Sequence, residues 1–260
     1  MLYGTKVILD LYRKDEFKPF IIIGDHGYGK SSYATSLIAD VYGHVFNHGK
    51  PYWDPWSKTS KEWFEAHIGF NPKEVLDEWQ HTKNREDWLI REYGDYPRKE
   101  YGDWKYEDKK RDFCYCWDDA GLWLHSLDFQ DPFVKDTGKY MQVVRTDWAC
   151  VMFTAISAED ITSKIRGLRN AIIIEITKNS SKAQPHRRIA EAYILRKSFK
   201  GRHWKDVQWQ DPFDCYVPDD FNEWYHPLRS KYASIAKQLM RKRLDDNKEL
   251  NSIIDNDNVG

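Results

Sequence analysis

Short apolar runs alternate along the chain with segments in which apolar residues recur every three or four positions. The runs are rich in β-branched and aromatic side chains, which predicts buried strands; they are Phe17–Ile23, Phe113–Trp117, Ala149–Thr154 and Ala171–Ile176. Helical spacing predicts helices over about residues 7–14, 30–43, 132–144 and 157–168. The last of these begins at a capping-box pattern, Ser157 with Asp160. Strands and helices that alternate in this way predict a three-layer α/β sandwich with a mainly parallel sheet.

Residues 50–112 differ from this pattern and combine mixed charge with six of the chain's 12 tryptophans. We expect two helices there, over about residues 58–67 and 71–83. In the second, Asn71 is the expected N-cap and Pro72 the first helical residue. Residues 93–111 have no clear period. The sequence therefore predicts a core over residues 1–180 with a Trp-rich insertion that is a candidate surface for a protein partner.

The pattern changes again beyond residue 180. Residues 188–195 and 206–209 predict an antiparallel pair or an extended edge, with breaks at Asp211-Pro212 and Val217-Pro218. A long charged helix is expected over residues 221–244, and the last dozen residues are expected to fray. Residues 181–260 are thus predicted to form a β extension followed by a C-terminal helical segment.

Composition excludes several classes of protein. The 260 residues are 41% hydrophobic and 31% charged, with only 14 Gly and 10 Pro, which excludes collagen-like and wholly disordered chains. No apolar run approaches the roughly 18 to 20 residues of a membrane helix. The first residues contain no uninterrupted apolar segment and no small-residue cleavage site, so we expect a cytoplasmic protein that does not bind membranes. The 4 cysteines form no CxxC pair, which favours buried thiols over a zinc site or a disulfide frame.

A glycine-rich motif between the first predicted strand and helix carries the clearest chemistry. Residues 24–31 read GDHGYGKS and match G-x-x-x-x-G-K-[ST] at every fixed position. In such a loop, backbone N–H groups and the helix N-terminus surround phosphate oxygens, the lysine adds a mobile charge and the serine hydroxyl binds Mg²⁺. The alternative is a glycine turn that happens to precede Lys-Ser. The residues expected to bind ATP are Gly24, Asp25, His26, Gly27, Tyr28, Gly29, Lys30, Ser31 and Ser32.

Two adjacent acids end the second predicted strand. A carboxylate at the tip of a strand near a phosphate loop holds Mg²⁺ opposite the loop hydroxyl, and Asp118 has this position. Asp119 follows where a water-activating base is expected, although its side chain is one methylene shorter than the glutamate many such enzymes carry. The competing interpretation is that both acids end the strand and cap the following turn.

Three further residues are candidates for catalysis. Thr154, at the end of the third strand, is placed to bind the γ-phosphate or the attacking water, or is an ordinary strand-end threonine. Arg166 and Arg169 lie on or just after the next helix. Either could reach the active site of an adjacent subunit and neutralise charge in the transition state, or could contact DNA or solvent instead.

The net charge of −1 conceals a strong asymmetry. Between Lys164 and Lys205 there are twelve basic residues and two acids, so this segment carries +10 and the remainder −11. Such a segment is either a solvated face or a surface that binds a polyanion. The residues expected to contact DNA are Lys182, Arg187, Arg188, Arg196, Lys197, Lys200, Arg202 and Lys205.

The order of these motifs resembles the P-loop ATPases of the additional-strand catalytic-glutamate division, which includes AAA+ and RecA/FtsK/HerA-like motors. The likeness covers roughly residues 17–177 and depends chiefly on the phosphate loop. The small, Trp-rich form is similar to ATPases carried by archaeal viruses and plasmids, including DnaA-like replication proteins. The predicted strand pair beyond residue 186 looks more like the sheet extension of FtsK/HerA-type motors than like an AAA+ lid. This resemblance implies assembly into a ring or filament and work on DNA.

Two other functions are compatible with a phosphate loop. In a small-molecule or nucleotide kinase, the insertion would build the acceptor site and the later arginines a closing lid. The Asp118-Asp119 pair disfavours this, because activation of water suits hydrolysis. In a GTPase, residues 118–121 would supply D-x-x-G, but the sequence contains no N-K-x-D to select guanine. ATP hydrolysis with Mg²⁺, coupled to replication initiation, helicase loading or DNA translocation, is therefore the function that the sequence favours.

Overall fold

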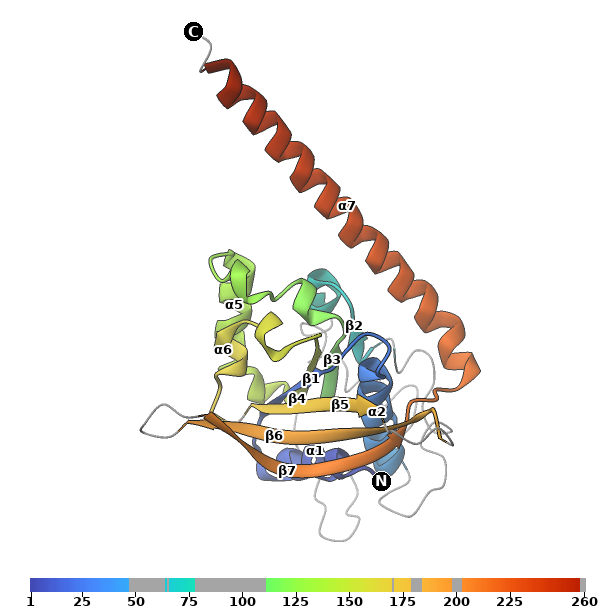
Figure 1. The fold of residues 1–260 in the computed structure, drawn as a ribbon. Coiled ribbons are helices and arrows are strands. Elements are labelled where there is room, and N and C mark those ends of the chain that lie inside the picture. The colour runs from blue at the N-terminus through green and yellow to red at the C-terminus, as the bar shows by residue number, and fades with distance from the viewer. Residues whose placement is uncertain are drawn as a thin grey trace. The chain divides into compact units, whose positions relative to one another are not determined.

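The computed structural model describes residues 1–46, 64, 66–77, 111–169, 171–178, 184–197 and 203–257. The chain divides into two compact units, Met1–Val217 and Pro218–Gly260. A single seven-stranded sheet organises the first unit (Figure 1). Its strand order is β2-β3-β4-β1-β5-β6-β7. The sequence pattern had instead placed the last two strands in one segment with the C-terminal helix.

The strands of the predicted parallel core are all present. They are β1 (Lys18–Ile23), β3 (Asp112–Trp117), β4 (Trp148–Thr154) and β5 (Ile172–Lys178). They pair in parallel, as does the short β2 (Ile68–Gly69), which the sequence did not predict. Every residue of β3 and β4 is buried, because a parallel sheet is covered on both faces.

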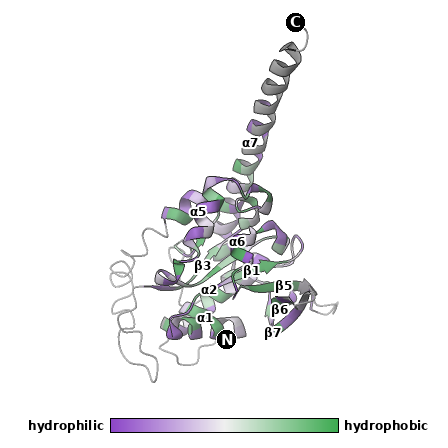
Figure 2. Ribbon diagram, turned by 90° about the vertical axis from the view of Figure 1, so that its left-hand side faces the viewer, coloured by the Kyte–Doolittle hydropathy of each residue, from purple (hydrophilic) through white to green (hydrophobic). Residues whose placement is uncertain are grey.

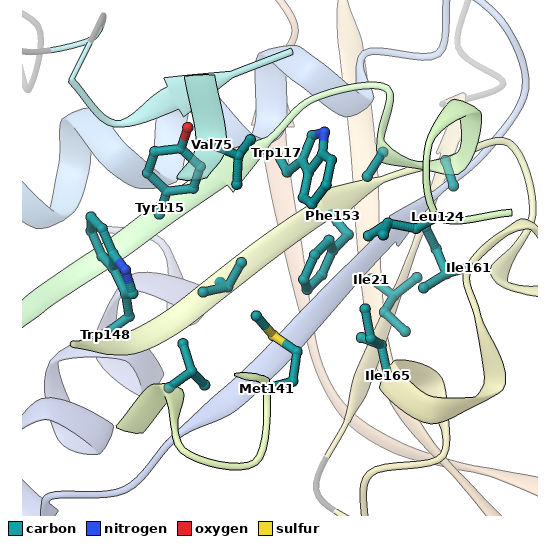
Figure 3. Packing of buried hydrophobic residues seen from close by; sticks show 14 residues of the cluster. Ile21, Val75, Tyr115, Trp117, Leu124, Met141, Trp148, Phe153, Ile161 and Ile165 are labelled. Atoms are coloured by element: carbon teal, nitrogen blue, oxygen red, sulfur yellow. The ribbon is translucent and has the colours of Figure 1, made fainter. Parts of the chain in front are cut away.

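Helices cover both faces of the sheet and make the predicted three-layer α/β sandwich. Helices α1 (Tyr3–Lys14) and α2 (Lys30–Phe46) pack against each other and against β3 and β4. Helices α5 (Pro132–Tyr140) and α6 (Ser163–Arg166) lie on the other side (Figure 1). There, Trp117, Phe153 and Ile21 of three adjacent strands pack with Met141 and Ile165 in one apolar cluster (Figure 3).

Helix α1 begins at Tyr3, four residues before the predicted start. Its N-cap residue, Leu2, contributes no side-chain hydrogen bond, but two distant carboxylates satisfy the first N–H groups. Asp40 of α2 accepts from the Leu2 N–H (2.7 Å), and Asp211 accepts from Tyr3 (2.6 Å) and Gly4 (2.9 Å). The start of this helix is therefore set by residues 38 and more than 200 positions away, which local spacing does not reveal.

The helix predicted over residues 157–168 is wrong as a continuous element. The capping box is present, since Ser157 N–H donates to Asp160 and Ser157 Oγ accepts from Glu159 N–H. It opens only the 3-10 turn η5 (Ala158–Asp160), after which extended backbone at Ile161 precedes the four-residue α6. The break buries Ile161 completely and lets Thr162 N–H donate to Leu124 O (2.8 Å). Similarly, α5 ends at Tyr140, and a separate 3-10 turn, η4 (Val144–Thr146), precedes β4.

The predicted antiparallel pair is confirmed and is longer than expected. Strand β6 (Arg187–Lys197) pairs with β5 on one side and with β7 (His203–Asp214) on the other. The break predicted at Asp211-Pro212 is wrong, because Pro212 lies inside β7 opposite Ile189. The sheet ends at β7, and an edge strand tolerates the missing N–H of proline. Figure 2 shows hydrophilic segments along β6 and β7, where the parallel strands are mostly hydrophobic.

The second unit contains α7 (Asp219–Asp257), a helix of 39 residues. It is longer than the helix predicted over residues 221–244 and includes residues that were expected to fray. Among the described residues, no helix is both long enough and apolar enough to cross a membrane.

Most of the Trp-rich insertion, including the helix predicted over residues 58–67, lies outside the described residues apart from a few positions before β2 and β3. The beginning of the next helix is described: residues 72–77 are helical, and Asn71 Oδ1 accepts from Glu74 N–H (3.0 Å), as expected for an N-cap. Its predicted end near residue 83 is outside the described part of the chain.

Candidate active site

The glycine-rich segment forms a tight loop between β1 and α2, at the carboxyl ends of the parallel strands. Gly24, Gly27 and Gly29 have φ angles of 149°, 73° and 95°, a region that other residues rarely adopt. A Cβ added to Gly24 would lie 2.9 Å from Ile176 O, whereas at Gly27 nothing lies within 4 Å. The loop is thus closely packed where it leaves β1 and open at its middle, where a ligand could approach the backbone.

Lys30 and Ser31 form the first turn of α2. The Lys30 ammonium, on a side chain only 8% exposed, donates to Gly24 O (2.7 Å) and Asp25 O (3.1 Å). It therefore lies over the loop, within reach of any anion that the loop amides bind. Ser32 is half-buried in the same turn, and Asp25 and His26 are exposed at the outside of the loop.

A chain of hydrogen bonds joins this helix to the ends of β3 and β4. Asp118 is 1% exposed, and its Oδ1 accepts from Ser31 Oγ (2.9 Å) and from Thr154 Oγ1 (2.6 Å). Thr154 Oγ1 in turn accepts from the Asp119 N–H (2.7 Å). Residues separated by 87 and 36 positions in the sequence thus meet at one carboxylate. Thr154 is fully buried, and its hydroxyl links the Asp118 carboxylate to the backbone of Asp119.

Asp119 has a distinctive backbone conformation. Its φ of 53° and ψ of 34° are left-handed, and it precedes the 3-10 turn η2 (Ala120–Leu122) without making a side-chain capping hydrogen bond. Capping of the following turn therefore does not explain this acid. Left-handed backbone is uncommon for non-glycine residues, and at the half-buried Asp119 it occurs two residues after the end of β3.

The strands of the antiparallel extension form one wall of the loop. Phe213 of β7 packs against Tyr33 of α2 with ring centroids 4.9 Å apart. A Cβ on Gly29 would lie 3.0 Å from the Cβ of Cys215. Arg188 of β6 donates from Nε to Tyr28 O (3.2 Å). Sequence patterns did not indicate these contacts, because they depend on the register of β6 against β7, in which Arg188 lies opposite Phe213.

Ionisable groups around the loop are perturbed by identifiable neighbours. A hydrogen bond to Asp25 raises the pKa of the Tyr28 hydroxyl, over whose ring the Lys178 ammonium lies at 4.7 Å. Burial raises the pKa of the Tyr33 hydroxyl well above its ordinary value, and the Asp211 carboxylate to which it donates (2.8 Å) acts in the same direction. Burial likewise raises the pKa of the Cys116 thiol. Both the phenol and the thiol are therefore neutral at physiological pH.

The two candidate arginines are not part of this hydrogen-bonded group. Arg166 ends α6 and is half-buried, and Arg169 is exposed. Neither side chain forms a hydrogen bond or ion pair with the described residues of the loop or with Asp118. The geometry of one chain thus assembles the loop, Ser31, Asp118, Asp119 and Thr154, and leaves both arginines outside.

The predicted DNA-contacting residues fall into different environments. Arg188 is 8% exposed and bonded to backbone carbonyls, so it does not belong to an accessible surface. Arg196 pairs with Asp206 (3.2 Å) and Lys205 with Glu175 (2.5 Å). Arg187 is exposed. Lys182, Lys200 and Arg202 lie outside the described residues, as does the side chain of Lys197.

The donor set suits Mg²⁺. No group of three or more His, Cys, Asp or Glu among the described residues could hold a metal ion on its own. Mg²⁺ in phosphate-loop proteins does not need such a group, since it takes one hydroxyl and one carboxylate from the protein and completes its shell with phosphate oxygens and water. The Ser31 hydroxyl and the Asp118 carboxylate, 2.9 Å apart, offer one group of each kind.

Comparison with known proteins gives structural likeness only. No protein-family model matches the chain, and no curated protein matches it. Among solved structures, the N-terminal domain of zonular occludens toxin from Neisseria meningitidis is similar over 75% of this chain and 95% of that domain, with 11% identity and a TM-score of 0.38. A KaiC-like protein from Pyrococcus horikoshii is similar over 76% of this chain and 87% of its own length, with 12% identity and a TM-score of 0.31. The chain's own sheet is mainly parallel, and its glycine-rich loop and Asp118 lie at the carboxyl ends of the parallel strands.

Proposed function

We propose that this chain is a Mg²⁺-dependent ATPase. The observation that carries the proposal is the hydrogen bond between Ser31 of the phosphate loop and Asp118 at the end of β3. It joins two motifs that are far apart in the sequence, in the arrangement that metal-assisted phosphoryl transfer requires. The open backbone at Gly27 and the Lys30 ammonium supply the phosphate-binding side of the same site.

In this proposal each residue has a defined task. Loop amides and Lys30 bind the β- and γ-phosphates, with the lysine exchanging its present carbonyl partners for phosphate oxygens. Ser31 and Asp118 would hold Mg²⁺, which neutralises charge on the phosphates. Asp119 accepts a proton from the attacking water, and Thr154 fixes the positions of both acids through the two bonds of its hydroxyl.

The strand order supports the additional-strand division. Strand β4 lies between β1, which precedes the phosphate loop, and β3, which ends in the acids. Thr154 reaches Asp118 because β4 pairs in parallel with both of these strands. A phosphate-loop kinase remains the alternative, but Asp119 beside Asp118 favours activation of water over transfer to an acceptor.

We further propose that ATP hydrolysis is coupled to a DNA transaction. The support is the sequence that joins β6 to β7 and the strand ends beside it, because the ten residues 196–205 contain five basic residues and no acid. A segment with this excess of positive charge suits the phosphate backbone of DNA. Arg166 and Arg169 lie outside their own chain's site, so assembly into a ring or filament would let either of them serve a neighbouring subunit.

The test is ATP turnover by the full chain, with and without DNA, over a salt series. We expect Lys30→Ala to reduce ATP binding and turnover at least about 100-fold, and the exposed Lys135→Ala of α5 to leave both unchanged. Stimulation by DNA that fades as salt rises supports the DNA proposal. Wild-type turnover by Lys30→Ala would refute the ATPase proposal, and turnover that requires a small phosphate acceptor would favour the kinase.

A further inference from the structure

Arg188, the second residue of β6, is a buried arginine whose partners are backbone carbonyl groups. Its Nη1 donates to Pro185 O (2.5 Å) and Arg187 O (2.9 Å), and its Nε donates to Tyr28 O (3.2 Å). The first two bonds hold the guanidinium against the start of its own strand and the residues just before it. The third joins that strand to the phosphate loop across 160 residues of sequence. Since an arginine that is only 8% exposed loses most of its hydration, these carbonyls replace water as its partners.

The bond to Tyr28 O determines the direction of the next amide. Tyr28 C=O and Gly29 N–H belong to one planar trans peptide, in which the carbonyl and the N–H point in opposite directions. When Arg188 holds the carbonyl toward β6, the Gly29 N–H is directed to the other side of the loop. Gly29 is the residue immediately before Lys30, so this amide is among those available to a bound phosphate.

The neighbouring strand limits the same peptide from a second direction. Cys215 lies just beyond β7, and its N–H donates to His186 O (3.0 Å), which places it beside the start of β6. Its Cβ is 3.0 Å from the position of a Cβ on Gly29, so the loop fits closely against this strand. Phe213 packs on Tyr33, one helical turn after Gly29. The end of the β6–β7 pair thus contacts the loop on both sides of its last glycine.

We propose that Arg188 is a positioning residue for nucleotide binding, through which the antiparallel extension sets the geometry of the phosphate loop. This inference rests on the proposed ATP site and adds to it a residue from outside both of its motifs. It also implies that the strand pair beside the basic segment 196–205 is physically connected to the loop, because β6 extends from Arg187 to Lys197, with one irregularity in its pairing with β7 at Ala192 and Tyr193.

The experiment compares nucleotide binding by full-length wild type, Arg188→Ala, Arg188→Lys and Lys30→Ala, with a fluorescent ATP analogue and Mg²⁺. Each protein is assayed at a temperature at which circular dichroism shows it folded. We expect Arg188→Ala to raise Kd and KM about tenfold and to leave kcat at saturation unchanged within about twofold. The variant loses the hydrogen bond from Arg188 to Tyr28 O, which orients the loop for binding but does not contact the reacting atoms. Arg188→Lys should fall between Ala and wild type, since an ammonium keeps the positive charge but cannot reproduce the planar, fixed arrangement of the guanidinium donors. Arg145→Ala, which changes an exposed arginine of η4, is the matched control.

Amide hydrogen exchange provides a readout that does not depend on Arg188→Ala folding. In Arg188→Lys, the amides of residues 24–30 should exchange faster than in wild type, while those of β1 and β4 keep their protection. A purely structural role would lower the active fraction without changing Kd. Unchanged Kd and unchanged loop exchange, together with weak binding by Lys30→Ala, would overturn the Arg188 inference alone; normal binding by Lys30→Ala would instead overturn the ATP site.

Discussion

The parallel and antiparallel halves of the sheet distribute their polar residues in opposite ways. Strand β4 is buried along its whole length, and its polar residue of interest, Thr154, is at its carboxyl end. Along β7, buried Trp209, Asp211 and Phe213 alternate with exposed residues. The first half is covered by helices on both faces, whereas the second forms the edge of the sheet.

This difference determines what a polar residue signifies in each half. In β3 and β4 of the parallel half, the charged residues and the threonine lie at or just beyond the strand ends, so Asp118 and Thr154 meet the phosphate loop. In the antiparallel half, charged side chains on neighbouring strands pair with each other, as Arg196 of β6 does with Asp206 of β7. Polar residues at the ends of the parallel strands therefore indicate a functional site. Polar residues along the outer strands indicate pairing between side chains of the sheet.

The largest expected effect is at Asp119, which tests whether chemistry belongs to the parallel half. Asp119→Asn should lower kcat at least about 100-fold while ATP still binds, because a general base contributes that much and the amide cannot take up a proton. Single-turnover kinetics with a binding titration measure both. Asp128→Asn, in the exposed 3-10 turn η3 (Ser126–Asp128), should behave as wild type. An unaltered kcat in Asp119→Asn would place the base elsewhere.

A smaller effect is expected at Thr154, whose hydroxyl joins the two acids. Thr154→Val keeps the shape of the side chain but removes both hydrogen bonds, so it should lower the free energy of unfolding by about 1–3 kcal/mol and reduce turnover as well. Thr154→Ser retains the hydroxyl and should lose about 1 kcal/mol through the missing methyl group, with turnover largely kept. Urea unfolding and ATPase assays on both variants decide the matter: equal turnover in Val and Ser would show that the hydroxyl has no positioning role.

The same contrast explains which features could be predicted from the sequence. The phosphate loop and the strands of the parallel half depend on local patterns, and β1 and β4 were predicted within one or two residues. The strand-end position of Asp118 was likewise local information. Once β3 and β4 are paired in parallel, contact between Asp118 and Thr154 follows. The pairing itself, however, cannot be deduced from the sequence of either strand alone.

The features that sequence patterns missed depend on distant partners. Helix α1 begins early because Asp40 and Asp211 satisfy its first amides. Arg188 is buried because β6 passes the phosphate loop, and a count of charges along the chain treats it as one more basic residue. The sequence contains no acid between Lys197 and Lys205. In the folded sheet, however, Arg196 pairs with Asp206 and Lys205 pairs with Glu175.

The smallest effect on stability is expected at the pair of Lys205 and Glu175, which tests the antiparallel half. Both side chains are more than one-third exposed, so breaking the pair should change the free energy of unfolding by less than about 1 kcal/mol. The hydrogen bond from Lys205 to Glu175 raises the pKa of the lysine. A raised lysine pKa adds stability that is present at neutral pH and is lost only as the pH rises through the alkaline titration of the folded state.

The effect of this pair on DNA binding should be larger than its effect on folding. In the folded protein, the Lys205 ammonium is engaged by Glu175 and lies 4.4 Å from the centre of the Tyr193 ring. Glu175→Gln removes the competing carboxylate and should strengthen DNA binding, and the slope of log K against log salt should steepen by about 0.9, as for one additional phosphate contact. Lys205→Ala should bind DNA more weakly than wild type, with a shallower slope. In the double variant, adding Glu175→Gln to Lys205→Ala should have no further effect on DNA binding. Fluorescence anisotropy with a labelled DNA duplex over a salt series measures all four proteins. If Glu175→Gln and Lys205→Ala both bind DNA as wild type does, the Lys205–Glu175 pair belongs to a solvated, internally paired face, and any DNA contact must lie elsewhere on the chain.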